Sequence, residues 1–297
     1  MKSARLTRAA ANGRLPGSAT IGSMASAIVG TVSEPLAVTP LNHRIVIGKD
    51  LRVVIPSTRG TGSSAVHGAL AIPAGTTHAL HARPDEPLAA IFLDAQHYRF
   101  EDAQRLAEAW RKFVPAQDAP IDLFDDIGGV FPRRRMDRRL ERAFDCLSVG
   151  AGVAETARRV SLSESRLTHL FSERVGISPR QWRRWLLLRK AMFALFTGQS
   201  ATAAAYFAGF ADAAHLSRTC RALTGATPGQ LGELATTFVT PRGRVLECAK
   251  LRGANQGPVT GAVTQALLAA GAVGLPQVLS ARTQDTTGAG SVTLTRG

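Results

Sequence analysis

The sequence predicts an α+β fold in which a small N-terminal β domain precedes an all-α domain. Short β-branched runs that end at glycine or proline occupy residues 35–98, a pattern typical of the strands of a sandwich or barrel. Apolar residues then recur at helical spacing through residues 137–235. The length of 297 residues suits two ordinary domains, and the hydrophobic fraction of 45% allows both to form cores.

The β domain is expected at residues 35–114. The β-branched residues between His43 and Ile55 predict strands, and Pro73-Ala-Gly75 supplies a turn between later strands. Residues 101–114 change to helical period, with Trp110 on the apolar stripe. This helix would either cover the β domain or form the seam of a homodimer.

Three segments lack the pattern of a folded core. Residues 1–34 are expected to be a flexible leader, because they hold several basic residues, no acidic residue before Glu34, and many alanines, glycines and serines. Residues 115–136 contain three prolines and two glycines and predict a linker. Residues 236–297 have few charges and no sustained period, so we expect a low-complexity, disordered tail.

Composition excludes several classes of protein. No stretch approaches the roughly 20 apolar residues of a membrane helix, so an integral membrane protein is not expected. The three cysteines are far apart and form no CxxC pair, which argues against a disulfide framework or a structural zinc site. These observations predict a cytoplasmic protein.

The positive charge is concentrated in one part of the chain. The formal net charge is +14, and residues 133–235 hold 17 basic against 8 acidic residues. A localised basic surface is typical of a protein that binds a polyanion, because each neutralised phosphate releases condensed counterions. A solvated basic face without a partner is the alternative interpretation of the charge alone.

The basic segment contains two similar helix–turn–helix units. In the first unit, residues 153–160 would form the supporting helix and Ser161-Leu162 the turn. Ser163 is a suitable N-cap for the presented helix at 164–174. A short exposed helix with small polar and basic side chains fits the major groove of DNA. The side chains expected to face outward are Ser165, Arg166, Thr168, His169 and Ser172.

The second unit repeats this plan. The supporting helix would be residues 201–208, and the turn would be residues 209–211. The presented helix would be residues 212–223, with Asp212 as its cap. Between the units, residues 182–196 predict a rigid helical spacer of about 20 Å. Two helices held in this way could enter successive major grooves, which recur about every 34 Å.

Residues 137–235 resemble the DNA-binding domain of AraC/XylS-type transcription regulators. The order and spacing of several motifs carry this resemblance over about 100 residues. The motifs of the first half are Ala154-Glu-Thr-Ala157, Ser163-x-x-x-Leu167-x-x-Leu170-Phe171 and Gly176-Ile-Ser-Pro179. Those of the second half are Arg189-Lys-Ala191, Ala205-x-x-x-Gly209-Phe210, His215-x-Ser217-Arg218 and Gly225-x-Thr227-Pro228.

The resemblance implies a sequence-specific transcription regulator that binds double-stranded promoter DNA, with RNA polymerase as a further partner and a homodimer as one assembly. It implies base contacts from both presented helices, and phosphate contacts from neighbouring arginines that position the protein without reading sequence. The implied base contacts are Ser165, Arg166, Thr168, His169, Ala214, Ser217 and Arg218. The implied phosphate contacts are Arg180, Arg183 and Arg221.

The N-terminal β domain is similar to the small cupin-like sensor domain of such regulators. Gly68-x-x-x-x-Pro73-x-Gly75-x-x-His78 resembles the second cupin motif, shortened by one residue. His78 and His81 are candidates for an effector pocket that would take a small molecule. Two imidazoles without a third anchored ligand make a poor metal site, so neither a metal nor another cofactor is expected.

We expect no enzyme, because no nucleophile–base pair stands out. Two alternatives stay open at this point. One is a metal-dependent cupin-type enzyme with an accessory helical domain. The other is a protein that binds DNA without sequence preference.

Overall fold

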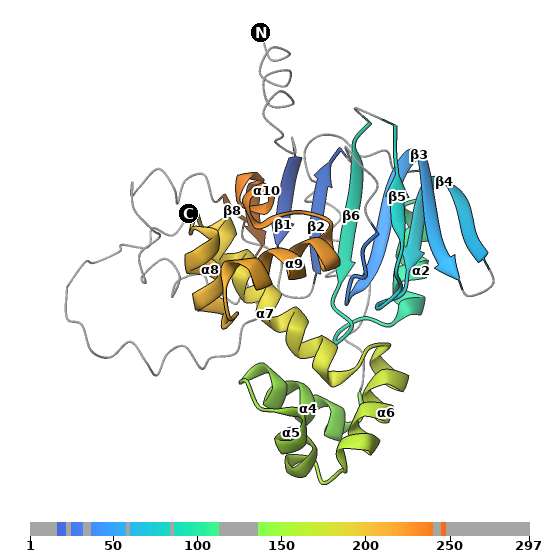
Figure 1. Ribbon diagram of the computed structural model, residues 1–297. Helices are drawn as coiled ribbons and strands as arrows, with labels where there is room; N and C mark the ends of the chain where they lie inside the picture. The colour runs from blue at the N-terminus through green and yellow to red at the C-terminus, as the bar shows by residue number, and fades with distance from the viewer. Residues whose placement is uncertain are drawn as a thin grey trace, which may run out of the picture.

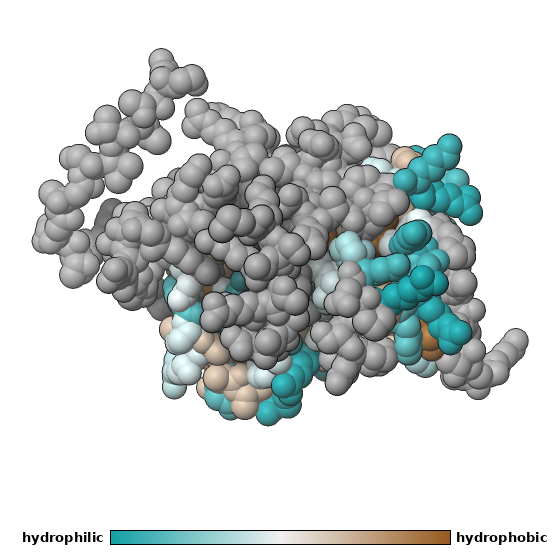
Figure 2. Space-filling view, turned by 90° about the horizontal axis from the view of Figure 1, so that it is seen from above, coloured by the Kyte–Doolittle hydropathy of each residue, from teal (hydrophilic) through white to brown (hydrophobic). Residues whose placement is uncertain are grey.

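The computed structural model describes residues 17–21, 25–31, 37–57, 60–83, 86–112, 136–239 and 245–247. A β-sheet and a group of helices lie side by side, and one long helix, α7, crosses the helical part diagonally (Figure 1). Seen from above, hydrophilic side chains gather over the side of the molecule where β3, β4 and β5 lie (Figure 2). No helix in the described part of the chain has the length and apolar character needed to span a bilayer.

The sheet is mixed and has the strand order β4-β3-β6-β2-β1-β7-β8, with β5 paired to β3. The β1–β7 pair is parallel, and the other pairs are antiparallel. The strands are β1 (Gly17–Ile21), β2 (Ala25–Gly30), β3 (His43–Ser57), β4 (Gly60–Ile72), β5 (Ala79–His81), β6 (Leu88–Leu93), β7 (Ala235–Val239) and β8 (Val245–Glu247).

Strands from both ends of the sequence complete the sheet, which corrects two of the predicted segments. The expectation of a leader at 1–34 is wrong at β1 and β2, and that of a disordered tail is wrong where β7 and β8 form. The physical reason is that these strands are stabilised by pairing with distant segments, as β1 pairs with β7. Small residues can then be core residues, and Ala19 is fully buried. Residues 1–16 of the expected leader lie outside the described residues, and so does the expected linker except for residue 136. The same holds for residues 240–244 and 248–297 of the expected tail.

Helix α2 (Phe100–Ala109) covers one face of the sheet. Its Leu106 and the following Trp110 are buried against Ile45 and Ile91 of the central strands. Of the two roles open for Trp110, the structure therefore shows the covering role. The opposite face forms a separate apolar cluster that includes Val46 and Phe92.

The helical domain begins and ends close to the predicted boundaries. Most of its helices start at a side chain that accepts a hydrogen bond from a free backbone N–H, the local signal that fixes a helix start. The helices are α4 (Arg138–Ser148), α5 (Val153–Arg159), α6 (Glu164–Val175), α7 (Pro179–Phe196), α8 (Ala201–Ala208), α9 (Ala213–Thr224) and α10 (Pro228–Glu233).

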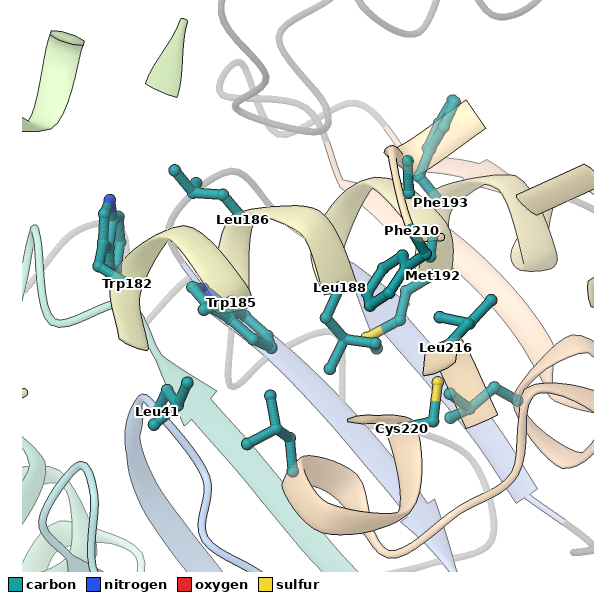
Figure 3. Packing of buried hydrophobic residues seen from close by; sticks show 14 of the residues in the cluster. Leu41, Trp182, Trp185, Leu186, Leu188, Met192, Phe193, Phe210, Leu216 and Cys220 are labelled. Atoms are coloured by element: carbon teal, nitrogen blue, oxygen red, sulfur yellow. The ribbon is translucent and has the colours of Figure 1, made fainter. Parts of the chain in front are cut away.

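Helix α7 is the centre of this domain. It starts at Pro179, three residues earlier than the predicted spacer, because Ser178 and Gln181 form a capping box and proline is favoured in the first turn. Near its N-terminus, Trp182 packs against Phe144 of α4 with ring centroids 4.9 Å apart. Further along, side chains from α7 meet residues of the second unit, as Figure 3 shows for Leu188, Met192, Phe210, Leu216 and Cys220.

Candidate nucleic-acid interface

The first helix–turn–helix unit consists of α5 and α6. Ser163 Oγ accepts a hydrogen bond from Arg166 N at 3.1 Å and so caps α6 as predicted. Leu167 and Phe171 are fully buried, which fixes the rotation of the helix about its axis. The opposite side of α6 is exposed and carries the four predicted contact residues Ser165, Arg166, Thr168 and His169.

The second unit consists of α8 and α9. Gly209 ends α8 in the left-handed conformation, with φ of 87°. Asp212 caps α9, and its Oδ1 accepts from His215 N at 2.6 Å. Leu216 is fully buried, so α9 has a defined outer side. Of the predicted contacts on this helix, Ala214 and Arg218 are exposed, and Ser217 is half-buried.

The arginines of these helices leave positive charge uncompensated. Among the described residues, Arg166 and Arg218 have no ion-pair partner, and neither do Arg180, Arg183 and Arg221. Arg180 and Arg221 are exposed and Arg183 is half-buried. Side chains of this kind are available for phosphate oxygens.

Helix α7 sets the distance between the two units. Figure 1 shows it running from the end of α6 to the start of α8. Its 18 residues correspond to about 27 Å at 1.5 Å per residue. This length is longer than the predicted spacer and closer to one turn of B-DNA, which is about 34 Å.

The β domain contacts the C-terminal ends of both presented helices. Two of its segments, residues 38–40 and 73–78, are joined by hydrogen bonds between Val38 and His78, and we call them the ledge. Thr39 N donates to Ala222 O in the last turn of α9 at 2.8 Å. A Cβ placed on Gly75 would lie 3.3 Å from Ile177 Cγ2, directly after α6.

This contact leaves the N-terminal halves of α6 and α9 free. All the predicted base contacts lie in those halves, and in helix–turn–helix proteins the N-terminal residues of the recognition helix contact the bases. The ledge therefore contacts both helices at the ends opposite to their predicted base contacts.

A buried ion pair also joins the two domains. Arg189 Nη1 of α7 lies 2.9 Å from Asp94 Oδ2, directly after β6, with exposed side-chain fractions of 14% and 5%. Near this pair, Trp185 extends from α7 toward Leu41 (Figure 3). The pairing of Asp94 with Arg189 could not be predicted from the sequence, because 95 residues separate them.

The two histidines of the predicted effector pocket differ in exposure. His78 is fully buried, whereas His81 at the end of β5 is exposed. The residue that contacts His78 is Arg44 of β3, whose Nη1 lies 3.0 Å from His78 Nε2. Burial, followed by the charge of Arg44, lowers the pKa of His78 to about 4, and burial lowers the pKa of Arg44 to about 10.

Arg44 was not among the predicted site residues. The pattern that could have indicated it is the alternation of side chains along β3, which places Arg44 on the same side of the strand as Val46. In the part of the chain that the structure describes, no cluster of three histidine, cysteine, aspartate or glutamate side chains could hold a metal ion.

Comparisons with known proteins agree with the geometry of the helical domain. Residues 156–233 match the family model described as a helix-turn-helix domain. The chain is 34% identical over 101 residues to the arabinose operon regulatory protein of Escherichia coli, and 37% identical over 79 residues to that of Salmonella typhimurium. The helical domain is of the AraC/XylS type. The match covers 32% of this chain and 35% of the E. coli protein, so the chain spans about a third of the length of that relative.

Two solved structures are also similar to this chain. An AraC-type transcriptional regulator from Chromobacterium violaceum is 24% identical, and the match covers 32% of this chain and 89% of that chain with a TM-score of 0.31. ToxT from Vibrio cholerae is 10% identical, and the match covers 70% of this chain and 97% of that chain with a TM-score of 0.44.

Proposed function

We propose that this protein is a sequence-specific transcription regulator that binds double-stranded promoter DNA through α6 and α9. The observation that carries the proposal is the pair of capped, similarly built helices whose C-terminal ends rest on the β domain. They expose Arg166 and Arg218, which form no ion pair with any residue that the structure describes. Arginine in such a position can donate two hydrogen bonds to guanine O6 and N7.

Each predicted contact has a defined task in this proposal. Arg166 and Arg218 read guanines, and Ser165, Thr168, His169, Ala214 and Ser217 contact neighbouring base edges. Arg180, Arg183 and Arg221 bind phosphates and fix the orientation of the domain on the duplex. RNA polymerase is the partner through which bound regulator affects transcription, and the protein acts in the cytoplasm, alone or as a homodimer.

The β domain acts as the sensor. A ligand that binds it changes DNA binding only if its affinity differs between two arrangements of the protein. The ledge offers a direct route for such a difference, because it contacts the last turn of α9 and the end of α6. A shift of the ledge would change how the two helices are held relative to each other.

Selection of binding sites from random double-stranded DNA tests the proposal. The full chain should enrich one sequence with two conserved blocks. Arg166→Ala should relax preference in one block and Arg218→Ala in the other, each by about 1–3 kcal/mol of discrimination. Arg105→Ala, which removes an exposed arginine from α2 of the β domain, is the matched control and should leave the selected sequence unchanged.

The same experiment distinguishes the alternative of non-specific binding. A chain that binds DNA without specificity would enrich no sequence at any salt concentration, and its affinity would depend on salt alone. That outcome would contradict the proposal.

A further inference from the structure

The first turn of α9 differs chemically from the first turn of α6. Each helix follows a cap side chain that accepts a hydrogen bond from the backbone N–H three residues later, and this shared feature aligns the two units residue by residue. The second residue of the helix is Ser165 in α6 and Ala214 in α9. The first residue is Glu164 in α6 and Ala213 in α9. The second unit therefore has methyl groups where the first unit has a carboxylate and a hydroxyl group.

Ala214 lies on the outer side of α9. Leu216 is fully buried, and two residues of an α-helix correspond to a rotation of about 200°. Ala214 is accordingly exposed, and so is Arg218 one turn further along the helix. Side chains four residues apart in a helix are neighbours, with about 5–6 Å between their Cβ atoms. The methyl group of Ala214 and the guanidinium of Arg218 thus belong to the same exposed face.

The polar residue of this first turn, His215, contacts the segment that precedes the helix. Its ring packs edge-on against the buried Phe210, with ring centroids 5.1 Å apart. Its backbone N–H donates to the cap Asp212. The residue of the first turn that lies opposite the buried Leu216 is therefore Ala214, whose side chain has neither a hydrogen-bond donor nor an acceptor.

An exposed alanine in this place is complementary to one base in particular. In the major groove all four bases present hydrogen-bond donors or acceptors, and thymine also presents its apolar 5-methyl group. Alanine cannot replace the water that polar base-edge atoms lose on contact, and polar groups without a partner are costly. Contact with a thymine methyl group avoids this cost and removes apolar surface of both partners from water.

We propose that Ala214 recognises the 5-methyl group of a thymine close to the guanine that Arg218 reads. This proposal rests on the proposed function and adds the base that the second unit selects. Because base pairs are stacked about 3.4 Å apart, the spacing of the two side chains places the thymine within about two base pairs of that guanine. The block read by the first unit is not restricted in this way, since the hydroxyl group of Ser165 can hydrogen-bond to several bases.

Replacement of single thymines by deoxyuridine in the selected DNA site tests the proposal, because it removes the methyl group and keeps the base pair. Fluorescence anisotropy measures the affinity of the full chain for each duplex. One replacement close to the Arg218-dependent guanine should weaken binding about fourfold, the effect of one buried methylene group. In Ala214→Gly the same replacement should leave the affinity unchanged, since the protein methyl group that contacts the base is gone.

Two further variants separate this contact from an effect on the helix itself. Ala203→Gly removes an exposed methyl group from α8 at a similar cost in helix propensity, and it should keep the full sensitivity to deoxyuridine. Ala214→Ser reproduces the residue at the equivalent position of α6, and it decides the question if Ala214→Gly fails to fold. Its hydroxyl group would lose water against the thymine methyl group, so the sensitivity should fall to about twofold or less.

Three results would overturn the proposal: a selected site without thymine within about two base pairs of the Arg218-dependent guanine, equal affinity for the thymine and deoxyuridine duplexes, or full sensitivity retained in both Ala214 variants. Each of these results requires a selected sequence and a guanine that depends on Arg218, so each leaves the proposed regulator intact. A chain that enriches no DNA sequence would instead contradict the proposed function, and this inference with it.

Discussion

In α6 and α9, apolar side chains are buried in the helical domain, and the residues predicted to contact DNA lie on the exposed side. Leu167, Phe171 and Leu216 are buried, and their positions decide which residues of α6 and α9 stay on the surface. Their apolar spacing was visible in the sequence, which is why the exposed faces could be predicted before the structure was known. Arg44 was not recognised in the same way, because the alternation of β3 places it on the side of Val46 but does not show that this side is buried.

We expect Arg180 to contribute charge without sequence preference. Arg180→Ala should weaken binding to selected and to unrelated DNA by the same factor, and it should reduce the slope of log affinity against log salt by about 1. Filter binding or fluorescence anisotropy at several salt concentrations measures both quantities. Arg105→Ala on the β domain is the control, and a change in sequence preference for Arg180→Ala would contradict a phosphate role.

The buried His78 makes stability depend on pH. The unfolded residue gains a proton near pH 6.5 and the folded one only near pH 4, so the unfolded state binds more protons between these values. Its contribution is therefore fully present above pH 6.5 and is lost as the pH falls toward 4, by up to about 3 kcal/mol. Urea unfolding across this range should show a smaller loss for His78→Gln than for the unaltered protein. An equal loss in both would show that another group is responsible, and His81→Gln is the exposed control.

At the scale of elements, the helices were predictable and several strands were not. Helix starts such as Ser163 and Asp212 are set by a side chain that accepts a hydrogen bond from the backbone N–H three residues later, so a local pattern is sufficient. Strands β1 and β7 are short, rich in alanine and threonine, and pair with each other across most of the sequence. No local signal specifies such a pairing, because the hydrogen bonds that stabilise the strand come from a distant partner.

The cap of α9 should matter for the second unit. Asp212→Ala removes the acceptor for His215 N and should lower the free energy of unfolding by about 1 kcal/mol. Asp212→Asn keeps an acceptor and should cost much less. Urea unfolding measures the difference, and equal stability of the two variants would show that the cap does not hold the helix.

At the scale of the whole molecule, the β domain and the helical domain are joined by specific contacts. The ledge and the ion pair between Asp94 and Arg189 bring together segments that lie far apart in the sequence. Sequence patterns indicated both domains but not how they are placed, since no periodicity relates the end of β6 to the middle of α7.

The interdomain ion pair should be energetically coupled. A double-mutant cycle with Asp94→Asn and Arg189→Gln should give a coupling free energy of about 1–3 kcal/mol, because both side chains are mostly shielded from water. The exposed pair Glu108–Arg111 serves as the control, with side-chain exposures of 72% and 64% and an expected coupling below about 0.5 kcal/mol. Equal coupling for the two pairs would mean that the domains are not held together at this point.

Interference with guanine N7 methylation on a selected DNA site tests the central claim most directly, since both presented helices are proposed to enter the major groove. The account predicts two groups of sensitive guanines about 10 base pairs apart. Arg166→Ala should abolish the sensitivity of one group and Arg218→Ala that of the other. A single group of sensitive guanines, or two groups that neither substitution affects, would contradict it.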